Sequence, residues 1–235
     1  MTTLSPNLFS GLQYLLEIDL SGNEIRAIDG TIFNELDLTK VNSSKNKIRC
    51  IDDGLFRELV NILEINLESN ELRTLDYKQF RGLISLKKLF LNDNKISYVG
   101  KRLLNELESL EEIDFSRNEI ISFDRTLFQG LVSLKAIRFS DNKLTHLDSL
   151  LFSNLVRLET IDSSENLLTG IDSDLFSNLV SLEEVNLKNN SIASVDPGTF
   201  NNLVNLTLVD LSGNDLAKED FIGAIKNKSN VIYIL

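Results

Sequence analysis

The sequence predicts an α/β solenoid, in which every repeat adds one short strand to a single parallel sheet. Two columns of residues that share a period support this prediction. Asn recurs every 24 residues, with one interval of 23, at Asn23, Asn46, Asn70, Asn94, Asn118, Asn142, Asn166, Asn190 and Asn214. Phe follows most of these asparagines ten residues later, at Phe33, Phe56, Phe80, Phe128, Phe152, Phe176 and Phe200. Phe9 precedes this column, and Leu104 interrupts it. A phase that holds over nine repeats indicates one continuous array.

A third observation places the strands. Each Asn lies in the frame L-x-x-L-x-L-x-x-N-x-L, where L is aliphatic or Phe except at position 6 of two repeats, which is Ser43 or Ser163. The fourth repeat shows the frame as Leu86, Leu89, Leu91, Asn94 and Ile96. Aliphatic residues at positions 4 and 6 alternate with polar residues at positions 3, 5 and 7, which is the pattern of a short strand with one buried face. We therefore expect positions 3, 5 and 7 to form the outward row of the sheet.

Both columns are expected to be parts of the scaffold. The turn after each strand leaves backbone groups inside the coil without a sheet partner, and a buried unpaired amide costs about 1 to 3 kcal/mol. An Asn side chain carries both a carbonyl and an amide, so it can satisfy backbone groups of both kinds. The Phe column is expected on the opposite wall, where a wider gap between coils needs a large apolar side chain.

These residues resemble the leucine-rich-repeat family, in particular its 24-residue "typical" class, over nearly the whole chain. The resemblance implies a right-handed solenoid with the parallel sheet on the concave face and short turns, or 3-10 or α segments, on the convex face. It also implies a protein-binding module of the extracellular receptor or secreted type. An intracellular scaffold or adaptor of the same fold is the alternative, since the sequence shows no secretory leader and only one cysteine, Cys50.

The chain departs from the family where Pro usually follows the convex aliphatic residue. Asp stands there instead, at Asp29, Asp52, Asp76, Asp124, Asp148, Asp172 and Asp196. Asp can accept backbone N–H bonds two or three residues on, so this column is expected to cap the turn that leads to each Phe. A calcium-binding ridge is the alternative.

The whole chain, residues 1–235, is expected to be one solenoid. Residues 1–14 contain a partial first repeat without a cap, residues 15–216 contain nine frames, and residues 217–235 are expected to form an irregular helix and a further strand. Because a solenoid exposes its core at an uncapped end, we expect a segment of a longer protein, or an end that pairs with another chain.

The composition argues against nucleic-acid binding, metal binding and catalysis. The 24 Lys and Arg residues face 35 Asp and Glu residues, a net charge of −11 that disfavours nucleic acid as a partner. His146 is the single histidine and Cys50 lies four repeats away from it, so neither a multi-histidine metal site nor a Cys-His catalytic pair is expected. No phosphate-binding or hydrolase motif is present, and no apolar run is long enough for a membrane span. We expect no enzyme activity, no cofactor and no metal.

What remains is the outward row, whose net negative charge favours a protein partner with a basic patch. Phe90 replaces the Asp or Asn that recurs at position 5, and Lys88 and Arg138 lie near it. Aromatic and Arg side chains are common hot spots of interfaces, so Phe90 is the expected apolar anchor; an isolated surface aromatic is the alternative. The predicted contact residues are Glu64, Asn66, Glu68, Lys88, Phe90, Asn92, Glu112, Asp114, Arg138 and Asp162.

Overall fold

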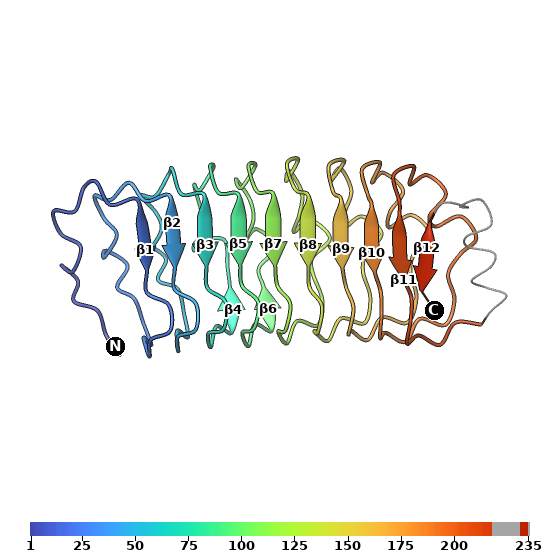
Figure 1. Cartoon of the computed structure of the whole chain (residues 1–235), viewed down its shortest axis with the longest axis horizontal. Helices are drawn as coiled ribbons and strands as arrows, with labels where there is room; N and C mark the ends of the chain where they lie inside the picture. Colours follow the sequence, from blue (N-terminus) through green and yellow to red (C-terminus); the bar gives the residue numbers. More distant parts are fainter. Residues whose placement is uncertain (218–230, 235) are drawn as a thin grey trace.

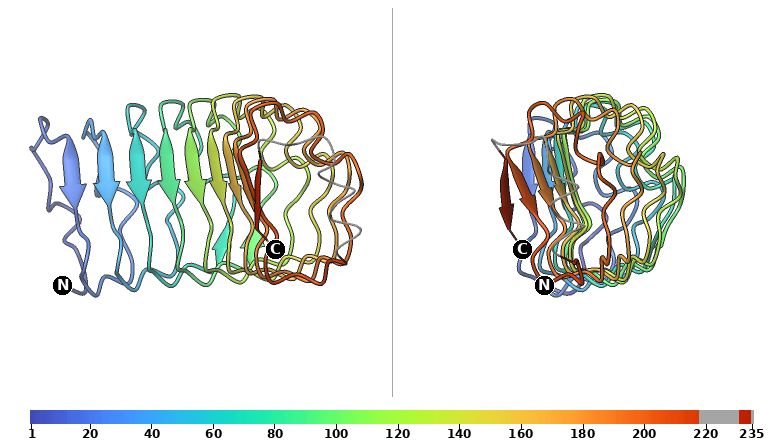
Figure 2. Two further views of the ribbon diagram at one scale, coloured as in Figure 1. Left: turned by 45° about the vertical axis from the view of Figure 1, so that its right-hand side comes forward. Right: turned by 90° about the vertical axis from the view of Figure 1, so that its right-hand side faces the viewer.

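The computed structural model describes residues 1–217 and 231–234, and it is the predicted solenoid (Figure 1). Ten strands form one parallel sheet in the order β1-β2-β3-β5-β7-β8-β9-β10-β11-β12. Their bounds are β1 Glu17–Asp19, β2 Lys40–Asn42, β3 Glu64–Asn66, β5 Lys88–Phe90, β7 Glu112–Asp114, β8 Ala136–Arg138, β9 Thr160–Asp162, β10 Glu184–Asn186, β11 Leu208–Asp210 and β12 Ile232–Ile234. The strands lie on one side of the coils, and the turns lie on the other (Figure 2).

The register of the sheet follows the period of the sequence, because each strand pairs with the equivalent strand of the next repeat. Residues at the same frame position pair directly, as Lys88 of β5 pairs with Glu112 of β7. In the nine three-residue strands between β1 and β11, the middle residue is buried and its neighbours face outward, as expected for positions 3 and 5. The expectation for position 7 was wrong in part, because Ser44, Ser116 and Ser164 are buried.

The inward turn at position 7 has a local cause. The side-chain oxygen of the Asp or Asn at position 5 accepts the backbone N–H of position 7, as Asp162 does from Ser164 at 3.1 Å. Ser164 also donates its hydroxyl to the same oxygen of Asp162 at 2.7 Å. These bonds form an Asx turn, which bends the chain away from the sheet face. The small serine side chains are buried after this turn, whereas Glu68 and Lys188 follow the same turn and are not buried.

The Asn column has the predicted scaffold role. Ile96 N–H donates to Asn118 Oδ1 at 2.9 Å, and Asn118 Nδ2 donates to the carbonyl oxygens of Leu91 at 3.0 Å and Phe115 at 2.9 Å. Each such side chain thus joins its own coil to the preceding one. The same pattern recurs at Asn46, Asn70, Asn94, Asn142, Asn166 and Asn190, all of them buried.

The Phe column fills the opposite wall, as predicted. Phe33, Phe56 and Phe80 are fully buried and stack with ring centroids 6.3 and 6.0 Å apart. Phe176 and Phe200 stack in the same way at 5.9 Å. The sequence did not suggest a second aromatic cluster, in which Phe123 contacts Phe115, Phe128 and Phe139 next to the place where Leu104 interrupts the column. Stacked rings of this kind bury large apolar areas and hold neighbouring coils together.

The convex side consists of turns, and no helix occurs in residues 1–217 or 231–234. Asp29, Asp52, Asp124, Asp148 and Asp172 each accept the N–H two residues on at 2.9 Å, which confirms the turn-capping interpretation.

Two members of this Asp column differ. Asp76 accepts from the adjacent Tyr77 N–H at 2.6 Å, while the carbonyl oxygen of Asp196 accepts from Thr199. Asp196 precedes Pro197, and proline restricts the backbone of the residue before it. The convex side also holds a two-stranded sheet that was not predicted, formed by β4 (Thr74–Leu75) and β6 (Tyr98–Val99).

Near the start of the chain, Leu4 and Phe9 pack against the core, and the Met1 amino group donates to Asn23 Oδ1 at 2.9 Å. At the other end β12 pairs with β11. The helix expected between residues 217 and 235 lies mostly outside the described residues.

Candidate binding surface on the concave sheet

The ten predicted contact residues form one continuous patch. They belong to β3, β5, β7, β8 and β9, which are consecutive neighbours in the sheet, or directly follow β3 and β5 in the case of Glu68 and Asn92. Most are half-buried, and Lys88 is exposed. The sheet therefore brings together side chains that are up to 98 residues apart in the sequence, from Glu64 to Asp162.

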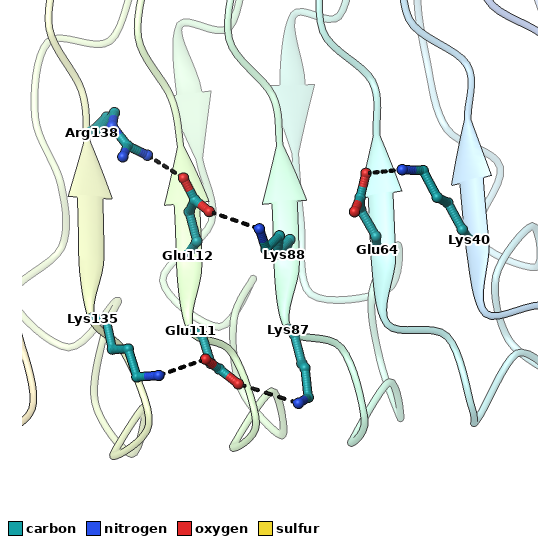
Figure 3. A network of polar contacts seen from close by, with 8 residues as sticks. All are labelled: Lys40, Glu64, Lys87, Lys88, Glu111, Glu112, Lys135 and Arg138. Carbon is teal, nitrogen blue, oxygen red and sulfur yellow. Dashed lines mark hydrogen bonds and ion pairs between the residues drawn. The ribbon is translucent and has the colours of Figure 1, made fainter.

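Ion pairs run across the strands of this patch (Figure 3). Lys40 Nζ lies 2.8 Å from Glu64, and Glu112 binds both Lys88 Nζ, at 3.5 Å, and the Arg138 guanidinium. The cations predicted to meet a partner are therefore already held by acidic neighbours. Around the centre of the patch, these basic and acidic side chains therefore neutralise one another in ion pairs across the strands.

A parallel row of ion pairs lies beside the first, just before the strands begin (Figure 3). Glu111 accepts from Lys135 at 2.8 Å and lies 3.4 Å from Lys87. The hydrogen bond from Lys135 lowers the pKa of Glu111, and the same bond raises the pKa of Lys135. Likewise, the bond to Glu64 raises the pKa of Lys40.

The position-5 residues of the patch serve the scaffold as well as the surface. Asn66 accepts the Glu68 N–H at 2.9 Å, and Asp114 accepts the Ser116 N–H at 2.8 Å. Phe90 and Arg138 stand at the same position and cannot accept such a bond. The sequence marked Phe90 as a departure from the repeat, and the structure adds that Phe90 and Arg138 each replace a residue that would form an Asx turn.

Phe90 lies between Asn66 and Asp114 in the register of the sheet. Its side chain is half-buried, so it is less exposed than the sequence suggested. An aromatic ring with polar residues on both sides offers apolar contact area in the middle of a hydrated surface. Such a ring can enter an apolar pocket of a partner while the surrounding polar groups remain hydrated.

The distribution of charge along the solenoid is a feature that the sequence analysis missed. All nine ion pairs among the described residues lie within residues 1–143, here called the N-terminal segment. Residues 144–217, here called the C-terminal segment, contain eleven acidic residues and only two basic ones. The signal was present at position 10, where charges alternate in sign over six repeats: Glu24, Lys47, Glu71, Lys95, Glu119 and Lys143.

The described residues contain no group of three His, Cys, Asp or Glu side chains arranged to hold a metal ion. Cys50 and His146 are both exposed. Nor do residues 1–217 and 231–234 contain a helix of the length and apolarity required to cross a bilayer.

Comparison with known proteins agrees with this architecture. The family model for the leucine rich repeat matches residues 37–96, 84–144, 108–164 and 157–216. No curated protein matches the sequence. Among solved structures, a chain of the Drosophila Toll–Spätzle complex is similar over 95% of this chain with 21% identity and a TM-score of 0.77.

Two further structures show the same fold. A chain of the TLR13–ssRNA13 complex is similar over 99% of this chain, with 22% identity and a TM-score of 0.58. A Leptospira interrogans leucine-rich-repeat protein is similar over 100% of this chain, with 21% identity and a TM-score of 0.58. This chain spans 34% of the matched Toll-complex chain, 45% of the TLR13-complex chain and 70% of the Leptospira protein. From its nine repeats and the matches to the family model, the chain belongs to the leucine-rich-repeat family.

Proposed function

We propose that this chain is a non-catalytic module that binds a protein partner through its concave sheet. The observation that carries the proposal is Phe90, an aromatic side chain in the middle of a regular polar sheet. The sheet is built from short strands fixed by the Asn column and the Phe column, so little conformational entropy is lost on docking. Contacts at this surface therefore convert efficiently into affinity.

The proposed contact surface is the patch from β3 to β9. Phe90 is its apolar anchor, with Glu64, Glu68, Asp114 and Asp162 as the acidic surround and Glu112 as the link between Lys88 and Arg138. Because the two cations are paired with Glu112, and Glu64 is paired with Lys40, the remaining acidic residues Glu68, Asp114 and Asp162 determine the field around the anchor. A partner with a basic patch fits this surface, and the field also steers it during the approach.

Nucleic acid is a less suitable partner for this chain. The TLR13 structure contains single-stranded RNA, but that is a property of that protein. Here the net charge is −11, and phosphate backbones bind where Lys and Arg displace counterions. The patch itself offers its cations only in ion pairs.

We further propose an extracellular or cell-surface location, by likeness to the Toll-complex chain. An intracellular scaffold or adaptor is the alternative, and the exposed Cys50 thiol suits a reducing compartment. Staining of an epitope-tagged full-length protein on unpermeabilised cells separates the two: surface signal supports the first location, and signal only after permeabilisation supports the second.

Affinity capture followed by measurement of the dissociation constant tests the binding surface. We expect Phe90→Ala to weaken binding of the captured partner about tenfold or more, because an anchor residue contributes upward of about 1.4 kcal/mol. Tyr98→Ala is the matched control, since Tyr98 is an exposed aromatic residue of the same coil but lies in β6. Equal affinity of wild type and Phe90→Ala would reject the anchor.

A further inference from the structure

The convex side has a charge pattern of its own. Of the six Lys and Arg residues in the eight convex turns that lead to the Phe column, five lie on the three consecutive turns at residues 52–58, 76–82 and 100–106. The sixth, Arg125, is on the next turn. The turns of the C-terminal segment, by contrast, contain only acidic and neutral residues. The same three turns also carry five acidic residues, so their net charge is zero, whereas the whole chain carries −11.

These three turns enclose two adjoining hollows of about 460 and about 260 Å³. Both hollows are lined by Tyr77, Arg81 and Glu106, so they form one continuous depression. Arg57 lies at one end of it and Arg102 at the other. The depression is large enough for a phosphate or sulfate group together with part of the molecule that carries it.

Of the two carboxylates that line this depression, Asp53 is paired with a cation, since it lies 3.1 Å from Lys78 Nζ. Glu106 accepts the uncharged Gly82 N–H at 3.1 Å and is the one carboxylate of the lining without a cation partner among the described residues. The guanidinium groups of Arg57, Arg81 and Arg102, however, form no hydrogen bond or ion pair with any residue in 1–217 or 231–234. Three cationic groups are therefore free to bind an anion, and a guanidinium offers paired N–H donors that match phosphate and sulfate oxygens.

The backbone beside the depression includes a short two-stranded sheet. The two-stranded sheet of β4 and β6 directly precedes the turns that carry Tyr77 and Arg102. Gly100 stands where other repeats have Asp, and its N–H donates to the Leu75 carbonyl oxygen at 2.8 Å. A Cβ atom at Gly100 would lie 3.0 Å from Asp76 Oδ1, so glycine permits this close approach. The fixed spacing of the turns reduces the entropy cost of closing three arginines around a ligand.

We propose that this convex depression binds a tetrahedral oxyanion, a phosphate or sulfate group carrying at least two negative charges. Arg57, Arg81 and Arg102 hold its oxygens, and the half-exposed ring of Tyr77 packs against the group to which the anion is attached. The site is separate from the concave sheet, so its test does not depend on whether the proposed protein-binding function is correct.

Calorimetric titration of the full chain at low ionic strength tests this site with three probes: sodium pyrophosphate, sodium sulfate and a sulfated tetrasaccharide. We expect saturable binding of at least one probe, weakened about tenfold or more in the double variant Arg57→Gln/Arg81→Gln. Stronger binding of pyrophosphate would assign a phosphate ligand, and stronger binding of the saccharide a sulfated one. Arg81→Lys should also weaken binding, because it keeps the charge but loses the planar fork.

The control is the double variant Arg26→Gln/Arg117→Gln, which removes the same charge at exposed residues outside the depression. Neither of these arginines has an ion pair among the described residues. The control should bind within about twofold of wild type, as expected for distant exposed charges that salt and water screen. Absence of saturation with all three probes, or equal losses in both double variants, would overturn the proposal. Thermal unfolding of each variant checks that the fold is intact.

Discussion

The N-terminal and C-terminal segments share one scaffold but have different surfaces. Asn118 and Asn190 form equivalent hydrogen bonds in the two segments, and both are 8% exposed. The N-terminal segment has 22 acidic and 19 basic residues and contains all nine ion pairs of the described chain. The C-terminal segment has eleven acidic and two basic residues and contributes to none of them. The core therefore fixes the period, while the surface residues remain free to differ from coil to coil.

The reason lies in the parallel register. Equivalent residues of neighbouring coils lie side by side, with strands about 4.8 Å apart, so a repeated charge would repel its own copies. In the N-terminal segment the sign alternates, as in Lys88 and Glu112, and repulsion becomes attraction. In the C-terminal segment Glu159 and Glu183 occupy the same frame position in adjacent coils, without a cation between them. Solvent screens this repulsion, and the segment keeps an acidic surface.

The largest expected effect tests whether the scaffold is the same in both segments. Asn118→Ala and Asn190→Ala should each lower the free energy of unfolding by about 2 to 4 kcal/mol, because each leaves a buried N–H and several carbonyl groups unpaired. Denaturant titration measures both. A difference between the two losses of more than about 1 kcal/mol would contradict the uniform scaffold, since it exceeds the usual net contribution of one hydrogen bond.

A smaller effect should separate the two surfaces. Glu112→Gln removes the acid shared by Lys88 and Arg138 and should lower the free energy of unfolding by about 1 kcal/mol, the upper range for exposed ion pairs. Glu184→Gln changes the same frame position in the C-terminal segment, where the side chain has no ion pair among the described residues. It should be neutral or slightly stabilising, because it removes one negative charge from a segment with eleven acidic and only two basic residues. Equal losses in the two variants would show that the ion pairs do not distinguish the segments.

The smallest effect is a pH dependence. The bond from Lys135 holds the pKa of Glu111 below its ordinary value of 4.5, so the folded state binds the proton less readily than the unfolded state. This stabilisation is present above about pH 4.5 and is lost as the pH falls through the lower folded value. Glu111→Gln should therefore flatten the dependence of the melting temperature on pH below about 4.5, an effect of about 0.5 kcal/mol or less.

Glu183→Gln is the control for this measurement, because Glu183 has the same frame position but no ion pair among the described residues. It should keep the wild-type pH profile between neutral and acidic conditions. If both variants flattened the profile equally, the origin of the dependence would be the total charge of the chain and not the bonds of Glu111.

The candidate contact surface was only partly predictable. The period placed Phe90 on the sheet and marked it as an exception, because any residue can be compared with its copies 24 positions away. The period could not show that the Asp114 carboxylate accepts a backbone N–H, or that Lys88 and Arg138 both pair with Glu112. Those outcomes depend on the rotamers of long side chains and on the distance between neighbouring coils.

By itself the sequence determined the strands, the buried Asn and Phe columns and the order in which coils stack. A fixed period makes residues i and i+24 neighbours before any coordinate is known. The tertiary structure alone decided which charges pair, that Ser116 turns inward, and that β4 and β6 form a second sheet beneath the arginine-lined depression. These features join different frame positions of different coils, and their distances follow from the spacing and curvature of the assembled solenoid, which the period does not specify.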